Sequence, residues 1–337
     1  MNQRLFFVGL LMLFAPSGLA CDLCAVYSAT DAREGSRDGF HFTIAEQFIP
    51  FRTFRLEGEK VSSSSGDFVD SSITHLVPGY NFSERFGVNL NLPVVYRSFQ
   101  RSDFRYSLTG PPVFEVERDS EFGAGDVALI GRFTVFDLRE MKRGFVVSVL
   151  AGVKFPTGDT DRIRDEVEQT IIFDSLQPPG TPHDPLGHAV SGVHQHDLSP
   201  GSGSFDGIFG LTLNSRWDRW FFNGQAQYYL RTEGEGFEFG DELLVSVGPG
   251  AYLITNPRYT LSLQGVATYE TMARDRVLGR KSDRTGLTAW YVGPQLGFTW
   301  GDRLSVQAGA DLPLRISNNG FQNVPDYRFH GGFTLRF

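Results

Sequence analysis

Residues 86–97, with the sequence FGVNLNLPVVYR, decide the fold of this chain. An apolar residue stands at every second position of this segment, and mostly small or polar residues stand between them. A period of two places successive side chains on opposite faces of an extended strand, whereas a helix repeats every 3.6 residues. The alternation lasts about twice as long as a strand of a soluble sheet, which has about five or six residues. The segment therefore predicts a long strand with one apolar face.

The same alternation recurs along the chain, for example at residues 145–155, FVVSVLAGVKF, and at residues 220–231, WFFNGQAQYYLR. A tilted membrane strand needs about 9–11 residues, and most of these segments reach that length. We expect about twelve strands, at residues 40–55, 68–82, 86–98, 123–136, 144–156, 203–214, 219–231, 241–254, 258–270, 287–300, 303–315 and 327–337.

The connections between these strands alternate in length. Short turns are expected at residues 83–85, 137–143, 215–218, 255–257 and 301–302, and long loops at 99–122, 157–202, 232–240, 271–286 and 316–326. Short turns at one end and long loops at the other are typical of outer-membrane barrels. The sequence therefore predicts an all-β fold, a transmembrane antiparallel β-barrel with short periplasmic turns and long extracellular loops.

The composition excludes several other classes of protein. The 337 residues carry 31 basic and 39 acidic side chains, a net charge of −8, and nucleic-acid-binding proteins usually carry a basic excess instead. Two cysteines are too few for a disulfide-stapled scaffold. Hydrophobic residues make up 41 % of the chain, and no long apolar segment follows the N-terminus, which argues against a helical membrane bundle.

The N-terminus has the features of a signal peptide. A basic residue, Arg4, precedes the apolar residues 5–14, and the small residues Gly18 and Ala20 favour cleavage before Cys21. We expect residues 1–20 to be the signal peptide, 21–39 a periplasmic N-terminal segment and 40–337 the barrel, in the outer membrane of a Gram-negative bacterium.

Cys21 and Cys24 form a C-x-x-C pair in the periplasmic segment. Three interpretations remain open: a local disulfide, a thiol site that binds Cu or Zn with further ligands, or a lipidated Cys21 that leaves Cys24 as a free thiol. No His follows Cys24 directly, so the pair is no c-type haem attachment site.

Aromatic residues near the predicted strand ends indicate two interfacial girdles. These residues are Tyr80, Phe82, Tyr96, Trp220, Tyr259, Tyr269, Trp290 and Trp300. The last predicted strand ends in Phe337, which resembles the terminal signature of barrels that are inserted by the bacterial outer-membrane assembly machinery. We expect that machinery and outer-membrane lipid to be partners of the chain.

Several short stretches are similar to a known family. They are GAGDV at 123–127, GVKFPTGD at 152–159 and GSGSFD at 201–206, with NLPV at 91–94 and DLPL at 311–314. Together they resemble the bacterial outer-membrane barrels of the phenol-degradation (MetA-pathway) transporter family. The resemblance implies a channel for small, often hydrophobic molecules and brings no catalytic residues. The residues alone favour PTGD at 156–159 as the exit of a strand into its loop over a ligand site.

The polar faces of the predicted strands carry charges of both signs toward the lumen. Such a lining fits a selective pore or a salt-bridged plug, and twelve strands lie between the narrow eight-stranded and the open sixteen-stranded barrels. Glu46 falls on the apolar side of its strand, which predicts a β-bulge there or a wrong register. The predicted lumen residues are Arg97, Asp126, Arg132, Lys154, Arg231, Asp311 and Arg336, with His75 and His330.

Four of the seven histidines lie in the predicted extracellular loop 157–202: His183, His188, His194 and His196. His194 and His196 project to the same side if their segment is extended, and neutral imidazoles bind Zn or Cu. A polar surface loop with incidental histidines is the alternative.

An enzyme is not predicted. Ser71, Ser72 and His75 are near one another in one strand, but Ser71 and His75 are four residues apart at about 3.3 Å per residue, which is too far for a direct hydrogen bond. No nucleophile elbow is present in the sequence.

These features predict an outer-membrane channel or transporter for small, hydrophobic or aromatic solutes, with loop 157–202 closing the outer mouth. The alternative is a non-conducting barrel that docks a periplasmic or surface partner in metal or redox handling. Nothing in the sequence favours a particular oligomeric state.

Overall fold

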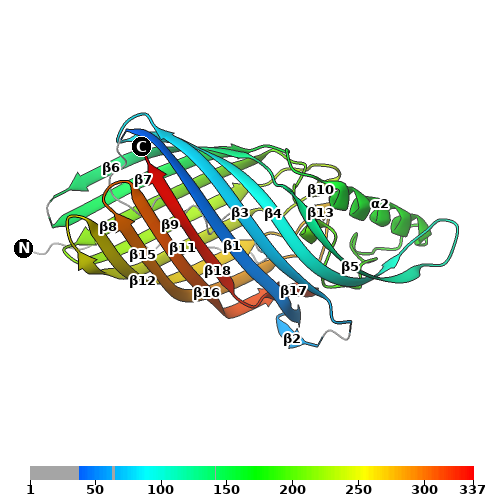
Figure 1. The fold of residues 1–337 in the computed structure, drawn as a ribbon. Coiled ribbons are helices and arrows are strands. Elements are labelled where there is room, and N and C mark those ends of the chain that lie inside the picture. Colours follow the sequence, from blue (N-terminus) through cyan, green and yellow to red (C-terminus); the bar gives the residue numbers. More distant parts are fainter. Residues whose placement is uncertain (1–37, 63–64, 141) are drawn as a thin grey trace, which may run out of the picture.

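The computed structural model of the chain describes residues 38–62, 65–140 and 142–337 (Figure 1). The expected signal peptide, Cys21 and Cys24 lie outside these residues, as does nearly all of the expected periplasmic segment. The barrel strands are β1 (Gly39–Leu56), β3 (Phe68–Asn81), β4 (Phe86–Arg105), β6 (Ala128–Arg139), β7 (Arg143–Lys154), β8 (Asp206–Trp217), β9 (Trp220–Leu230), β11 (Glu242–Thr255), β12 (Tyr259–Met272), β15 (Leu287–Trp300), β16 (Leu304–Asn318) and β18 (Arg328–Arg336).

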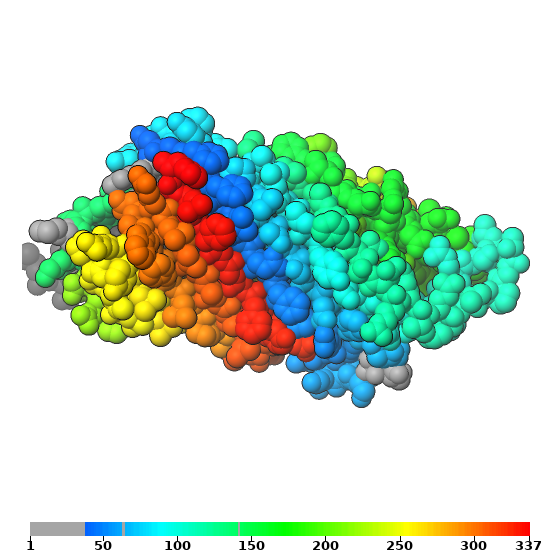
Figure 2. Space-filling view, viewed as in Figure 1, coloured from blue at the N-terminus to red at the C-terminus, as the bar shows by residue number. Residues whose placement is uncertain are grey.

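These strands close into a twelve-stranded antiparallel barrel, as predicted. Each strand pairs with the next barrel strand along the chain, and β1 closes the ring by pairing with both β3 and β18. Ile44 on β1 lies opposite Leu76 on β3 and opposite Phe333 on β18. Figure 2 shows this seam on the surface, where β18 in red lies against β1 in blue.

The short turns gather at one end of the barrel and the long loops at the other (Figure 1). We call these the inner end and the outer end. The loops at the outer end contain small elements: β2 (Glu59–Val61), β5 (Val113–Ala124), helix α2 (Asp161–Leu176), a 3-10 turn (His196–Leu198), β10 (Phe237–Glu238), β13 (Arg276–Val277), β14 (Arg280–Lys281) and β17 (Phe321–Pro325). Within the described residues, no helix is long and apolar enough to cross a membrane.

The prediction of a loop at 99–122 was wrong. Strand β4 continues to Arg105 and pairs with β5 from Val94↔Ala124 to Arg105↔Val113, so this part of the chain is a hairpin. The predicted strand 123–136 accordingly splits into the last two residues of β5 and most of β6. The hairpin projects beyond the barrel at the outer end (Figure 1).

Alternation places the apolar faces outside. On β6, Leu129 and Phe133 are 44 % and 47 % exposed on the outer surface, whereas Ile130 and Arg132 between them are buried inside. The predicted girdle residue Tyr80 is likewise exposed near the inner end, and Trp290 is exposed further toward the outer end. An apolar outer surface is what a lipid environment requires of a barrel.

The predicted irregularity at Glu46 is absent. Residues Gly39 to Phe51 of β1 pair with β3 in unbroken register, so Glu46 does face outward with Phe48. Its carboxylate accepts hydrogen bonds of 2.5 Å each from the hydroxyls of Ser72 and Thr74 on β3. These donors satisfy the carboxylate without a bulge.

Candidate functional site: the lumen and its cap

The segment between β7 and β8, residues 155–205, folds over the outer end of the barrel, and we call it the cap. Ile163 and Val167 on α2 pack with Leu186, Phe237 and Val277. Elsewhere in the cap, Val193 and Leu198 pack against side chains of the barrel strands, namely Phe54, Val69 and Phe99. The cap is therefore attached through two apolar clusters, one to the neighbouring outer loops and one to the barrel strands.

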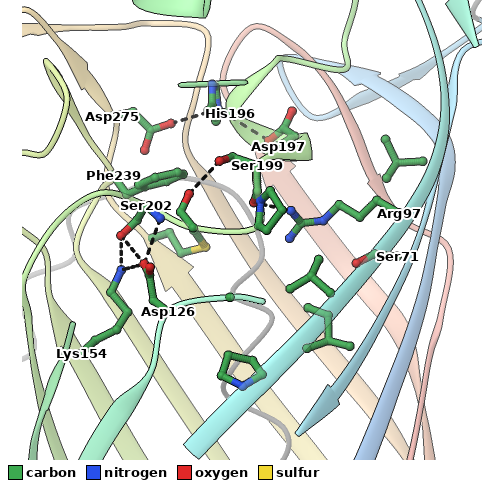
Figure 3. A pocket seen from close by; sticks show the side chains of 18 of the residues that line it. Ser71, Arg97, Asp126, Lys154, His196, Asp197, Ser199, Ser202, Phe239 and Asp275 are labelled. Atoms are coloured by element: carbon green, nitrogen blue, oxygen red, sulfur yellow. Dashed lines mark hydrogen bonds and ion pairs between the residues drawn. The ribbon is translucent and has the colours of Figure 1, made fainter. Parts of the chain in front are cut away.

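Lys154 forms the centre of a buried ion network directly beneath the cap (Figure 3). Its Nζ lies 2.9 Å from Oδ2 of Asp126 and 2.6 Å from Oδ2 of Asp206, and it donates a hydrogen bond to Oγ of Ser202. Asp206 also forms an ion pair with Arg231 at 3.0 Å, and Arg231 forms another with Glu242 at 3.2 Å. Two cations thus join three carboxylates across five positions of the wall.

The glycine-rich stretches meet at Asp126. Its carboxylate accepts hydrogen bonds from the backbone N–H groups of Thr157, Gly158 and Ser202. Gly158 and Gly201 lie so close that a Cβ on Gly201 would be 2.5 Å from the carbonyl carbon of Gly158. PTGD at 156–159 is therefore the exit of β7 and also part of the contact that fixes the cap to the wall.

Arginines of β4 extend from the wall to the cap. Arg97 donates a hydrogen bond of 2.6 Å to the carbonyl of Ser199, and Arg101 donates one of 3.3 Å to the carbonyl of Val193. In the opposite direction, from the cap to a strand, Arg162 of α2 bonds to Glu117 and Glu121 of β5. The cap is thus bound by charged hydrogen bonds as well as by apolar packing.

The other predicted lumen residues lie deeper in the barrel. Asp311 lies 3.8 Å from His330, and Arg132 bonds to Asn81 and to Thr134. Arg336 bonds to Ser305 near the inner end. The structure adds one deep pair that the sequence analysis did not single out: Arg328 is buried, 2.6 Å from Glu270.

Cavities follow one another along the lumen. The outermost has a volume of about 150 Å³ and lies beneath the cap (Figure 3). Two smaller cavities of about 60 and 70 Å³ follow, and a cavity of about 460 Å³ opens at the inner mouth. The three inner cavities share lining residues from one to the next: Gln264 between the first two, and Tyr252 between the last two.

A cluster of buried apolar side chains, which we call the constriction, lies between the outermost cavity and the next one inward. On β8, Ile208 lies between Asp206 and Thr212, and on β9, Tyr229 lies between Arg231 and Gln225. Asp206 belongs to the ion network, and Arg231 lines the outermost cavity. Thr212 and Gln225 line the next cavity inward. The constriction consists of Ala128, Ile130, Leu150, Ile208, Tyr229 and Leu244.

The four loop histidines do not form one group. His183 lies 2.6 Å from Asp174, and His188 shares a hydrogen bond of 3.1 Å with the hydroxyl of Thr170. His194 and His196 lie side by side, with ring centres 5.2 Å apart, next to Glu166 of α2. Glu166 is not among the predicted site residues, because residues 157–202 are predicted to be a loop.

Glu166, His194 and His196 shift one another's pKa values. Burial by itself would lower the pKa of His196, but the adjacent Glu166, Asp197 and Asp275 raise it to about 10. The same ion pair lowers the pKa of Glu166 in spite of its complete burial. Burial and the neighbouring His196 lower the pKa of His194 to about 3, so that its ring is neutral.

His75 lies beside Asn91 of the neighbouring strand. Its Nδ1 lies 3.0 Å from Oδ1 of Asn91, and Ser72 faces outward toward Glu46. Ser71 faces the outermost cavity.

The sequence comparison agrees with the family resemblance. Residues 192–321 match the sequence profile of the family described as "Putative MetA-pathway of phenol degradation". The chain resembles this family over most of its second half. The stretches at 201–206 and 311–314 lie within the matched residues, and the earlier stretches lie outside them. No curated protein gives a significant sequence match.

The chain shares its fold with a solved structure, and two others superimpose more weakly. The crystal structure of an outer membrane channel from Pseudomonas putida F1 superimposes with a TM-score of 0.60 at 13 % identity, over 91 % of this chain and 98 % of that one. The translocator domain of the autotransporter NalP from Neisseria meningitidis gives 0.41 at 10 % identity, covering 93 % of each chain. The TodX monoaromatic hydrocarbon channel gives 0.40 at 9 % identity, over 90 % of this chain and 91 % of that one.

Proposed function

We propose that this chain is a channel in the outer membrane of a Gram-negative bacterium that passes small hydrophobic solutes, above all single aromatic rings. The observation that carries the proposal is the outermost cavity, which lies within the lumen of a closed barrel, directly beneath the cap. The fold match to a protein described as an outer membrane channel supports the transport role. The family description, which names phenol, supports the solute class.

The outermost cavity has two chemically different walls. Val69 and Ile73 of β3, with Val95 of β4, form an apolar wall, and Asp126 and Lys154 belong to a charged one. An apolar cavity of about 150 Å³ holds a benzene ring. An aromatic ring with one hydroxyl would place the ring on the apolar wall and the hydroxyl toward the polar groups, as ligand sites commonly do.

We assign the chain a transport role rather than catalysis. The hydrogen bond between His75 and Asn91 engages Nδ1 of the histidine that lies near Ser71 and Ser72 in the sequence. Ser71 and Ser72 lie on opposite faces of β3, so they do not form one site. The constriction around Ile208 and Tyr229 is suited to gating, because narrow apolar segments exclude water and ions.

Uptake of labelled phenol by Gram-negative cells that lack general porins tests the proposal. Cells that express the chain should take up phenol faster than cells without it. The variant Ile73→Trp, which fills the outermost cavity, should abolish the gain. Leu76→Trp on the outer face of the same strand should retain it. Each barrel is first shown to be folded by its heat-modifiable migration on a gel. Equal uptake with and without the folded chain would contradict the proposal and favour a non-conducting barrel.

A further inference from the structure

Two buried polar atoms of the cap face each other without a hydrogen-bond partner among the described residues. They are Nδ1 of His194 and Oε1 of Glu166, 3.9 Å apart. The two side chains are 1 % and 0 % exposed. A buried polar atom without a partner is costly, so a pair of them indicates a missing group between them.

His196 supplies a third possible ligand atom next to these two. Nδ1 of His196 lies 2.5 Å from the other carboxylate oxygen of Glu166. One ligand atom each from Glu166, His194 and His196 lie within 4.8 Å of one another. Two ligands that each lie about 2.0–2.2 Å from one zinc ion are about 3–4 Å apart, so the separation of His194 and Glu166 suits a shared ion.

The surroundings favour a cation. Nε2 of His196 has no hydrogen-bond partner among the described residues, and it lies 3.5 Å from Asp197 and 3.6 Å from Asp275. Three carboxylates thus surround two imidazoles in an interior that excludes most water. A divalent cation would offset this excess of negative charge.

We propose that Glu166, His194 and His196 form a site for a divalent cation of the zinc class. Two imidazoles and one carboxylate are a common zinc donor set, which leaves a fourth position for water. Binding would replace the hydrogen bond between His196 and Glu166 and release the proton that the pair holds, because ligands bind metal in their deprotonated form. The ion would join helix α2 to the segment around the 3-10 turn and hold the cap in its closed form.

The same loop supplies matched controls. His183 and His188 bind Asp174 and Thr170 instead, so they lie outside the proposed donor set. The proposal therefore predicts a difference between histidines that are close in sequence.

The proposal is tested by zinc titration of the barrel, refolded in metal-free detergent buffer, with a chelator dye that competes for the zinc. The wild type should bind one Zn²⁺ per chain. His194→Ala and Glu166→Gln should each weaken binding at least tenfold, and His183→Ala should bind as the wild type does. Wild-type binding no tighter than that of folded His194→Ala would overturn the proposal, and so would an equal loss in His183→Ala.

Cobalt substitution gives a readout that needs no variant. One equivalent of Co²⁺ added to the wild type should produce the visible absorption of a four-coordinate ion with nitrogen ligands. Zn²⁺ should also slow proteolysis within the cap. An absorption spectrum no different from that of Co²⁺ in buffer would overturn the proposal even if the variants failed to fold.

Discussion

The outer and inner parts of the lumen are built from different chemistry. Beneath the cap, Lys154 and Arg231 are buried with three carboxylates, and the chain folds back over them. The third cavity, toward the inner end, is lined largely by hydroxyl and amide side chains such as Thr260, Gln264 and Gln295. The inner mouth beyond it is a wider cavity of about 460 Å³, and charged side chains there, such as Asp218 and Arg303, are exposed rather than buried.

This difference indicates that access to the lumen is controlled at its outer end. Polar, uncharged side chains line a water path at little cost in free energy, whereas a buried ion network holds its groups in one arrangement. The inner end is therefore suited to free exchange with the surrounding water, and the outer end to a closed state that must be opened. Substitutions at one end of the lumen at a time test this difference.

The largest effect is expected from Lys154→Met. The substitution leaves Asp126 and Asp206 buried without their shared cation, which typically costs about 3–5 kcal/mol. Denaturant unfolding of the barrel in detergent measures this loss of stability, and protease cleavage in the cap gives a second readout. Arg336→Met at the half-exposed inner end is the control and should cost about 1 kcal/mol or less. An equal loss in both variants would remove the distinction between the two ends.

Ile208→Ala should widen the constriction. Loss of a buried isoleucine side chain costs about 2–5 kcal/mol, and the space it leaves joins the outer cavity to the next one inward. Conductance of the open channel should rise, as measured in a planar bilayer. Phe209→Ala changes the outer face of the same strand and should leave the conductance unchanged. A rise in both variants would place the constriction elsewhere.

Gly201→Ala should loosen the contact between cap and wall. Its Cβ would meet the backbone of Gly158, and overpacking of this kind costs about 1–3 kcal/mol. Faster proteolysis of the cap is the expected result. Gly110→Ala serves as the control, since no atom lies within 4 Å of that Cβ position. Identical proteolysis rates in the two variants would show that the close glycine contact is dispensable.

The smallest effect concerns pH. The hydrogen bond with Asp174 raises the pKa of His183. The stabilisation from this pair is complete below the ordinary histidine pKa and is lost as the pH rises through the raised one. Asp174→Asn should lower the pKa of His183 toward its ordinary value, which an NMR titration of labelled histidine measures. An unchanged midpoint would contradict the pairing.

The barrel wall could be predicted from sequence because its rules are local. Alternation and turn length predicted the twelve barrel strands, and they placed Lys154 and Asp126 on the polar faces. The pairing of those two side chains could not be predicted, since it joins residues 28 positions apart through contacts with no periodic pattern. The hairpin partner of β4 was missed because β5 is charged on one face and exposed on most of its length.

The cap illustrates the same limit. Helix α2 is largely polar, and the only signals for it were Thr160 before its first turn and the spacing of Ile163 and Val167, which are four residues apart. Without the helix, Glu166 could not be placed beside His194 and His196. The histidine cluster was visible as composition, but its division into separate partners depends on the fold of the cap.

Single-channel recording of the wild type and of a cap-deleted chain tests the central claim most directly. Gly201 N–H donates a hydrogen bond of 2.8 Å to the carbonyl of Asp159, so a short Gly-Ser linker can replace residues 161–198 without disturbing Lys154. We predict rare, small conductance steps for the wild type and frequent, larger steps for the deleted chain. Equal conductance in the two folded proteins would contradict control of the lumen by the cap.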